Sequence, residues 1–250
     1  MGDLIDTTEM YLKTIYEMNE DGVPPLRARI VERLGHSGPT VSQTIGRMER
    51  DGLVHVRDDR RLELTDEGLA RATEVMHKHR LAELLLLNVI GLDWAHLHVE
   101  ACRWEHVMSD QVEERLQELL ADTSYDPYGN PLPGVTLPEG QEYVSLATLA
   151  SGQVSGASEG FTPPSPLEGG AQPYVLCDVV RIGEPVQADQ LLLEEIAAAG
   201  IRPGSRVRIK THHHMISLTL VSDQPLVDNP EKTLAIPLDL APHFFVAVVK

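Results

Sequence analysis

The sequence predicts a mainly α-helical protein with small β parts, arranged as three successive regions. Residues 4–64 show the order helix, turn, helix and hairpin. Residues 66–120 show helical periodicity, and short apolar strands separated by turn residues return after Tyr174. We therefore expect a winged helix-turn-helix, a helical domain and a small β-barrel domain, in that order.

The N-terminal region begins with a helix over residues 4–18, where apolar side chains recur at helical spacing. Asp6, Thr7 and Thr8 are candidate N-caps, because their short polar side chains can accept hydrogen bonds from the first backbone amides. Segment 22–25, which contains a glycine and two prolines, ends this helix.

Two further helices and a hairpin complete this region. A short amphipathic helix is expected over residues 26–34, and Pro39, which suits a first helical turn, begins the next one. Gly52 ends that helix. The alternating runs 53–57 and 61–64 then predict two short strands joined by a polar turn.

The middle region is expected to be helical over residues 66–120, with a break near residues 91–93. Its segment 81–90 would be apolar on nearly all sides of a helix. Such a helix must be buried, and a subunit interface is the easiest way to bury it, so the segment predicts a homodimer. Segment 130–134, with two prolines and a glycine, ends the helical part.

The C-terminal region combines strands with one short helix, expected over residues 189–199. Residues 151–173 are rich in Gly, Ser and Pro and lack periodicity, which indicates a linker or a long loop. The strands are expected over residues 174–182, 206–210, 215–221 and 244–249.

Composition and charge exclude several classes of protein. No apolar run approaches the roughly 18 residues of a membrane-spanning helix, and the first residues do not resemble a signal peptide. We therefore expect a cytoplasmic protein with no membrane partner. The net charge of −17 argues against a general nucleic-acid coat. Residues 27–61 nevertheless hold eight arginines against five acids, so any DNA contact should be confined to that segment.

The helix that begins at Pro39 has a polar, donor-rich face. Hydroxyls and arginines near a helix N-terminus suit phosphate contacts, and a glutamine can pair with adenine in the major groove. Ordinary surface helices also have polar faces, but the order of two helices and a hairpin is uncommon, so we expect DNA binding. The predicted DNA-contacting residues are Arg27, Ser37, Pro39, Thr40, Ser42, Gln43, Arg47, Arg50 and Arg60.

Cys102, Glu105 and His106 stand at positions i, i+3 and i+4, so on a helix they would share one face. A thiol, a carboxylate and an imidazole together suit a divalent transition metal better than they suit packing. Each residue alone has an ordinary explanation, as a buried cysteine or a structural histidine. Met10 on the first helix could supply a further thioether donor. The other cysteine, Cys177, lies in an apolar strand and is expected in the core.

A second group of candidate ligands lies nearby in the sequence. His79 and Glu83 stand at positions i and i+4, and His98 begins the next helix. Two imidazoles and a carboxylate can form an ancillary metal site, although a solvated helix face explains their spacing almost as well. Three successive histidines at 212–214 could also bind metal, but the tip of a hairpin turn is the favoured interpretation.

The chain resembles the diphtheria-toxin-repressor family of iron-dependent transcriptional regulators over about its first 140 residues. The resemblance runs through segments 6–12 (DTTEMYL), 26–30 (LRARI), 37–43 (SGPTVSQ), 47–53 (RMERDGL), 78–83 (KHRLAE), 100–110 (EACRWEHVMSD) and 129–131 (GNP). The C-terminal third resembles the SH3-like domain of that family.

This resemblance implies a homodimeric, metal-activated repressor and not an enzyme. The family's primary metal site falls here on Met10, Cys102, Glu105 and His106. Its ancillary site falls on His79, Glu83 and His98, completed by Glu184 and Gln187 of the C-terminal domain. Since Met10 lies in the DNA-binding domain and the other primary ligands do not, a metal there would tie two domains together.

The resemblance also sets the expected domains. These are a winged helix-turn-helix DNA-binding domain over residues 1–73, a helical dimerisation and metal-binding domain over 74–140, and an SH3-like domain over 141–250. Residues 146–149 are expected to supply an early strand of the last domain. Segment 151–173 would then be an insertion within it.

The implied partners are a second copy of the chain and a palindromic operator of iron-homeostasis genes, bound by one or two dimers. Thiolate and thioether donors favour Fe²⁺, with two ions per subunit, and Co, Ni, Zn or Mn should substitute in vitro. Two alternatives stay open. One is a manganese-responsive regulator of the same fold. The more distant one is a metal-dependent hydrolase using His79, Glu83 and His98, which no HExxH-type motif supports.

Overall fold

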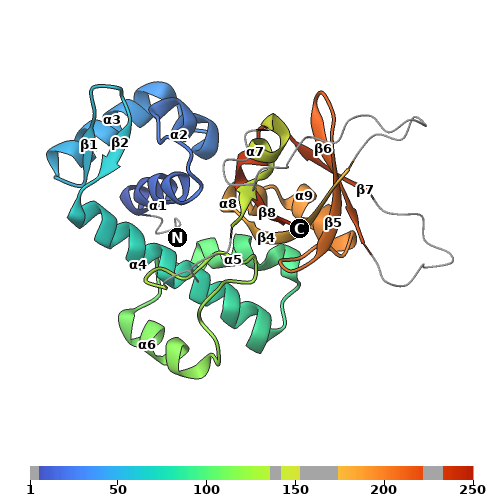
Figure 1. Cartoon of the computed structure of the whole chain (residues 1–250). Helices are drawn as coiled ribbons and strands as arrows, with labels where there is room; N and C mark the ends of the chain where they lie inside the picture. Colours follow the sequence, from blue (N-terminus) through green and yellow to red (C-terminus); the bar gives the residue numbers. More distant parts are fainter. Residues whose placement is uncertain (1–5, 136–141, 153–173, 222–232, 250) are drawn as a thin grey trace. The chain divides into compact units, whose positions relative to one another are not determined.

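The computed structural model describes residues 6–135, 142–152, 174–221 and 233–249 (Figure 1). The chain divides into two compact units. The first comprises residues 1–127 and 131–136, and the second comprises residues 128–130 and 137–250. Each unit is described by itself.

The first unit begins with the predicted order of two helices and a hairpin after an initial helix. Its elements are α1 (Thr7–Glu20), α2 (Arg27–Leu34), α3 (Gly38–Arg50), β1 (Val54–Val56) and β2 (Leu62–Leu64). Asp6 caps α1, because its carboxylate accepts a hydrogen bond of 2.7 Å from the Thr8 amide. The two strands pair antiparallel, which completes a winged helix-turn-helix.

One hydrophobic core holds this part of the chain together. Helix α3 contributes Val41, Ile45 and Met48, which stand at i, i+4 and i+7 and are fully buried. The opposite side of α3 is therefore left to solvent. The remaining members of the core come mainly from α1, α2 and the hairpin, and include Tyr11, Leu12, Ile15, Ile30, Leu53, Val54 and Leu62.

Helix α4 (Asp66–Leu85) carries the chain from the hairpin into the helical region. Its first turn lies directly against the hairpin, because a Cβ on Gly68 would come within 1.9 Å of the Leu53 carbonyl oxygen. The predicted break is confirmed at Gly91, which has a φ of 75°. The elements after α4 are η1 (Leu86–Ile90), η2 (Trp94–His96), α5 (Leu97–Trp104) and α6 (Asp110–Leu119).

A second break, at residues 105–109, contradicts the prediction of continuous helix. Helix α5 ends at Trp104, and Ser109 caps α6 by accepting a hydrogen bond from the Val112 amide. A serine that bonds the backbone ahead of it favours a new helix start over continuation of the old helix. Glu105 is therefore the C-cap of α5, and His106 lies in the turn that follows.

Only some of the apolar side chains of segment 81–90 are buried within the first unit. Leu81 and Leu84 pack in a second core with leucines of α6 and of the segment that follows it. Val89 and Ile90 are instead 57% and 55% exposed, so the interface prediction now rests on the end of the segment. None of the described helices combines the length and the apolar composition needed to cross a membrane.

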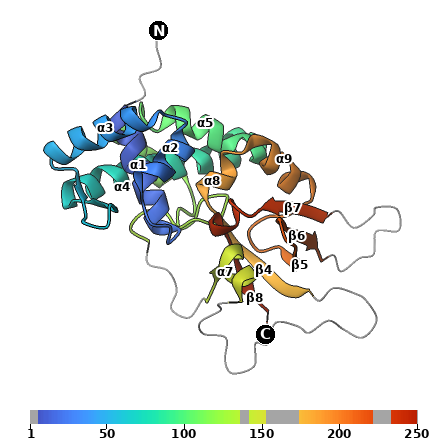
Figure 2. The ribbon, with the colours of Figure 1, turned by 90° about the horizontal axis from the view of Figure 1, so that it is seen from above.

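The second unit is built on a six-stranded antiparallel sheet in the order β3-β8-β4-β5-β6-β7, most of which Figure 2 shows side by side. The strands are β3 (Val144–Ser145), β4 (Val175–Ile182), β5 (Arg206–Thr211), β6 (Met215–Leu220), β7 (Thr233–Pro237) and β8 (Phe244–Val248). The helices are α7 (Leu146–Ser151), α8 (Glu184–Gln187), α9 (Gln190–Ala198) and the short η3 (Ala241–His243). Four strands and α9 match their predicted positions, and the C-terminal fold class is confirmed.

The strand expected over residues 146–149 is wrong, because these residues form α7. Ser145 caps that helix by accepting a hydrogen bond of 3.1 Å from the Thr148 amide. Leu146 and Leu149 stand at i and i+3, which places both on one face of a helix but on opposite faces of a strand, and both are buried. The expected insertion, 151–173, lies outside the described residues from residue 153 onward.

Candidate metal centre

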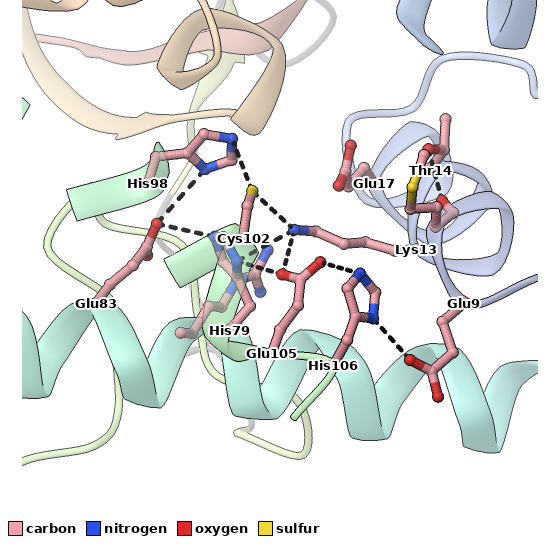
Figure 3. A network of polar contacts seen from close by, with 12 residues as sticks. Glu9, Lys13, Thr14, Glu17, His79, Glu83, His98, Cys102, Glu105 and His106 are labelled. Carbon is pink, nitrogen blue, oxygen red and sulfur yellow. Dashed lines mark hydrogen bonds and ion pairs between the residues drawn. The ribbon is translucent and has the colours of Figure 1, made fainter. Parts of the chain in front are cut away.

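Potential metal donors of the first unit converge from three places in the chain (Figure 3). Helix α4 supplies His79 and Glu83, which stand one turn apart. Helix α5 supplies His98 and Cys102, also one turn apart, and the turn after α5 supplies Glu105 and His106. Helix α1 faces this group with Glu9 and Lys13.

The four residues from α4 and α5 form a buried cluster of imidazoles, carboxylate and thiol. His79 Nε2 lies 2.9 Å from Glu83 Oε1, and His98 Nδ1 lies 3.6 Å from the same oxygen. His98 Nε2 lies 3.5 Å from Cys102 Sγ. Donor atoms of His79, His98 and Cys102 all lie within 4.8 Å of one another, so modest side-chain movements would let one ion bind all three.

Glu105 joins this cluster to helix α1. Its Oε2 lies 2.5 Å from His79 Nδ1 and 2.7 Å from Lys13 Nζ. Its other oxygen lies 3.2 Å from His106 Nε2, and the opposite nitrogen of His106 lies 2.7 Å from Glu9 Oε2. A continuous chain of charge-assisted contacts therefore runs from α4 through the turn after α5 to two positions on α1.

The electrostatics of the cluster favour a thiolate at Cys102. Burial raises the pKa of this thiol, but the positive charges of His98 and Lys13 outweigh burial and hold it well below its usual value. Burial likewise lowers the pKa of His98, while the Cys102 thiolate and Glu83 oppose it and raise it to about 9. A thiolate is the form of cysteine that binds metal.

The carboxylates are kept ionised for the same reason. Burial raises the pKa of Glu83, but His79 and His98 bring it below its usual value. Burial also raises the pKa of Glu105, and Lys13, His79 and His106 lower it more strongly. The cluster is therefore a buried set of anionic and imidazole donors, stabilised by cations of the chain itself.

Two buried atoms of this cluster fit a role in metal binding. Within the described part of the chain, Glu83 Oε2 and His98 Nδ1 are inaccessible to solvent and have no hydrogen-bond partner. Leaving a buried polar atom unsatisfied costs about 1–3 kcal/mol. A bound cation would use the lone pair of Glu83 directly and that of His98 once this imidazole has released a proton, so the donors present fit a divalent transition metal.

The structure does not separate the two predicted ligand groups. Cys102, predicted in the primary site, lies next to His98, predicted in the ancillary one, and Glu105 contacts His79. Met10 is half-buried on α1, three residues before Lys13. The assignment of ligands to two sites stays a prediction.

Lys13 and Glu9 are parts of this network that sequence reasoning missed. Both are on the same helix as Met10, at positions i and i+4, so they share one face with each other. Lys13 is only 5% exposed. One sequence signal could have indicated their role. Both are charged residues close to the predicted ligand Met10, on the side of an amphipathic helix that packs inward.

Glu184 and Gln187 stand one turn apart on α8 of the second unit. The Gln187 side-chain amide donates a hydrogen bond of 2.7 Å to the Ile182 carbonyl, which fixes the side chain against its own unit. Their contribution to the ancillary site stays a prediction.

The predicted DNA-contacting residues lie on the exposed side of the helix-turn-helix and at the hairpin turn. Ser37 caps α3, and the α3 residues Pro39, Thr40, Ser42, Gln43, Arg47 and Arg50 are all exposed. Arg27 begins α2 and is half-buried. Arg60 lies at the tip of the hairpin with a φ of 69°, which turns the chain tightly between β1 and β2. The geometry keeps these side chains available for DNA, and their contacts stay predictions.

Two family models match the first unit. The model for the N-terminal DNA binding domain of iron dependent repressors matches residues 3–62. The model for their metal binding and dimerisation domain matches residues 65–134. The predicted helix-turn-helix and helical regions thus coincide with two domains of known type.

Whole proteins give the same result. A diphtheria toxin repressor of Corynebacterium efficiens is 50% identical over 222 residues, covering 88% of this chain and 89% of the relative. The iron-dependent repressor IdeR of Mycobacterium tuberculosis is 50% identical over 212 residues, covering 84% and 86%. A solved manganese-dependent transcriptional repressor in complex with manganese superposes with a TM-score of 0.71 at 26% identity, covering 97% of this chain and 100% of that one.

These relatives are transcriptional repressors. The expectation that the chain is not an enzyme is therefore confirmed, and the alternative of a metal-dependent hydrolase is wrong. The chain belongs to the family of iron-dependent repressors, with an N-terminal DNA-binding domain and a metal-binding and dimerisation domain.

Proposed function

We propose that this protein is a homodimeric transcriptional repressor that binds palindromic operators of iron-homeostasis genes when it is loaded with iron(II). One observation carries the proposal most directly. The donor cluster of α4 and α5 faces helix α1, and the same helix forms part of the core that holds the DNA-reading helix α3. Metal occupancy can therefore act on the element that positions α3.

Metal binding and the orientation of α1 are thermodynamically linked in this proposal. A ligand shifts a conformational equilibrium only by its preference for one state. In the proposed primary site, Met10 lies on α1 while Cys102, Glu105 and His106 lie at and beyond the end of α5. These four residues would hold the metal, and a bound ion would supply the positive charge that offsets the repulsion between their lone pairs. Only an orientation of α1 that brings Met10 to the other ligands satisfies all of them, so binding favours that orientation.

We propose a second, ancillary ion at His79, Glu83 and His98, completed by Glu184 and Gln187. Two iron(II) ions would then bind per subunit. The buried, unsatisfied atoms of Glu83 and His98 support this second site. The domain division at residues 73 and 140 belongs to the same proposal. Helix α4 is continuous across the first boundary, so any movement between these two domains must bend or rotate about it.

Iron(II) is favoured over manganese by the ligand chemistry. A Cys102 thiolate and a Met10 thioether are softer donors than manganese prefers. The curated relatives that are half identical to this chain are named diphtheria toxin repressor or iron-dependent repressor. The manganese-dependent repressor is more distant, at 26% identity. A manganese regulator is the second candidate, and operator binding at buffered, cell-like free Fe²⁺ or Mn²⁺ distinguishes the two.

The DNA and partner surfaces follow from the same arrangement. We propose that the exposed side chains of α3 enter the major groove, with Arg27 and Arg60 contacting the backbone on either side. The exposed Val89 and Ile90 are proposed to lie in the dimer interface, where their apolar surface would be buried. A two-fold dimer then presents two α3 helices to the two halves of a palindrome, with one or two dimers per operator.

The test is operator binding by fluorescence anisotropy, with and without anaerobic iron(II), for the wild type and Cys102→Ala. We expect tight binding only for the metal-loaded wild type, and sedimentation of the same samples should show a dimer. Cys177→Ala is the matched control, because Cys177 is fully buried in the second unit and should leave the metal response unchanged.

Two outcomes would contradict the proposal. Equal affinity of the metal-free and metal-loaded wild type would remove metal control of DNA binding. Full activation of Cys102→Ala by iron(II) would show that the thiolate is not part of the activating site.

A further inference from the structure

Lys13 is a buried lysine in the middle of the donor cluster (Figure 3). Its ammonium group donates to Glu105 Oε2 at 2.7 Å and to Cys102 Sγ at 3.8 Å. It also lies 3.1 Å from His79 Nδ1. These three contacts are with a carboxylate oxygen, a sulfur and an imidazole nitrogen, each of which can be a metal ligand.

The contacts with Glu105 and Cys102 satisfy Lys13 with lone pairs that a metal would also need. A buried ammonium group is costly unless it is paired and hydrogen-bonded, and the same holds for the buried Glu105 carboxylate and the Cys102 thiolate. The lysine and the two anions therefore stabilise one another. A divalent cation cannot be close to the same donors at the same time, because it would repel the ammonium group and compete for its lone pairs.

We propose that Lys13 is a built-in cation that occupies the donor cluster in the metal-free protein and must leave before a metal ion binds. The inference rests on the proposed function, since it assigns a regulatory role at the same site. Lys13 then stabilises the metal-free state and raises the metal concentration at which the cluster fills. Lys13 is on α1, so its departure also releases α1 from Glu105.

The helix provides a place for the displaced side chain. Glu17 stands four residues after Lys13 on α1, and its buried carboxylate lies 3.4 Å from Arg33. Residues at i and i+4 lie next to each other on a helix, so a rotation about the lysine side-chain bonds brings its ammonium group toward Glu17. Met10 is three residues before Lys13 on the same helix, so the thioether can approach the cluster as the ammonium group leaves.

The test is a Co²⁺ titration without DNA, followed by the thiolate-to-cobalt absorption and calibrated with a competing chelator. Lys13→Met keeps most of the length of the side chain and removes the charge, and Lys13→Leu, which adds no thioether donor, should give the same result. We expect Lys13→Met to bind Co²⁺ about tenfold or more tightly than the wild type, because hydrogen bonds to charged groups no longer have to be broken. We also expect its metal-free form to melt at a lower temperature, since Glu105 loses a buried partner.

Lys78→Met is the matched control. Lys78 is also a buried lysine, but its carboxylate partners lie outside the donor cluster. They are Glu74, Asp110 and Glu113, at 2.5, 2.9 and 3.9 Å. Its replacement should lower the melting temperature without changing the Co²⁺ affinity. Lys13→Arg keeps the positive charge, and its Co²⁺ affinity provides a second test if Lys13→Met folds poorly. We expect its affinity to stay closer to the wild type than to a charge-free variant such as Lys13→Gln.

The proposal is overturned if Lys13→Met and Lys13→Gln bind Co²⁺ as weakly as the wild type or more weakly. It is equally overturned if Lys78→Met tightens binding as much as Lys13→Met does. Failure of the proposed function would look different, because the wild type would then bind no Co²⁺ through Cys102 or would bind operator DNA regardless of metal.

Discussion

The two ends of helix α1 are held in opposite ways. At its C-terminal end, Glu20 receives two hydrogen bonds, of 2.9 and 2.5 Å, from the guanidinium of the fully buried Arg80. Arg80 also donates to the Pro131 carbonyl and lies 3.6 Å from Asp126. At its N-terminal end, Glu9 and Lys13 contact His106 and Glu105, which are proposed metal ligands.

The difference lies in where the compensating charge comes from. At the Arg80 end, the cation that balances Glu20 and Asp126 is a side chain of the protein itself. The Lys13 end gathers several anionic donors that a metal ion would bind more strongly than a lysine does. Thr8, at this same end, lies 3.4 Å from Arg47 of α3. In the proposed mechanism a metal would therefore act on the N-terminal end of α1 while the C-terminal end stays fixed, and the N-terminal end contacts α3, the helix proposed to read DNA.

The largest effect is expected from breaking the fixed end. Arg80→Met leaves Glu20 and the buried Asp126 without their cation, so we expect the free energy of unfolding to fall by about 3–5 kcal/mol. The loss should be the same with and without metal. Urea unfolding followed by circular dichroism measures it.

Arg115→Met is the control for this prediction. Arg115 pairs with Glu118, and their side chains are 77% and 66% exposed, so its loss should change stability by less than about 0.5 kcal/mol. A loss of similar size in both variants, or a loss in Arg80→Met that metal restores, would remove the distinction between the two ends of α1.

A chemical effect is expected at the metal end, where the two cysteines differ. The pKa of Cys102 is held well below its usual value by His98 and Lys13, whereas burial and Asp178 raise the pKa of Cys177 to about 12. Because a lowered pKa keeps the thiolate present at neutral pH, alkylation of Cys102 by iodoacetamide should change little between about pH 7 and pH 9, unlike that of an ordinary thiol.

Mass spectrometry of the metal-free protein should find label on Cys102 and none on Cys177. Metal should protect Cys102. Labelling of Cys102 that rises about 25-fold between pH 7 and pH 9, as expected for a thiol with a pKa of about 8.5, would contradict the thiolate assignment.

Much of the first unit follows from local sequence signals. Asp6 and Ser37 are short polar side chains placed ahead of amphipathic segments, and both cap the helices that follow them. The polar positions of α3 are exposed because the apolar ones, Val41, Ile45 and Met48, recur at helical spacing. The spacing of Cys102, Glu105 and His106 favours a metal site, whereas the spacing of His79 and Glu83 fits a solvated face almost as well, and their role as ligands is implied by the family resemblance.

The remaining features depend on tertiary structure. Cys102, Glu105 and His106 would share one face only on a continuous helix. Ser109 instead caps a new helix, and the chain turns at residues 105–107. Lys13 could not be assigned from spacing, because a lysine on an amphipathic helix is usually solvated. Its burial follows from the thiolate of α5 and the carboxylate of the turn after α5, which lie against its ammonium group.

Hydrogen–deuterium exchange along α1, with and without iron(II), tests the central claim most directly. Metal should slow the exchange of amides in residues 10–14, beside the donor cluster, and leave residues 17–20, beside Arg80, unchanged. In Cys102→Ala, neither half of the helix should respond to the metal. Uniform protection along α1, or protection confined to residues 17–20, would contradict the account of a helix fixed at one end and held by metal at the other.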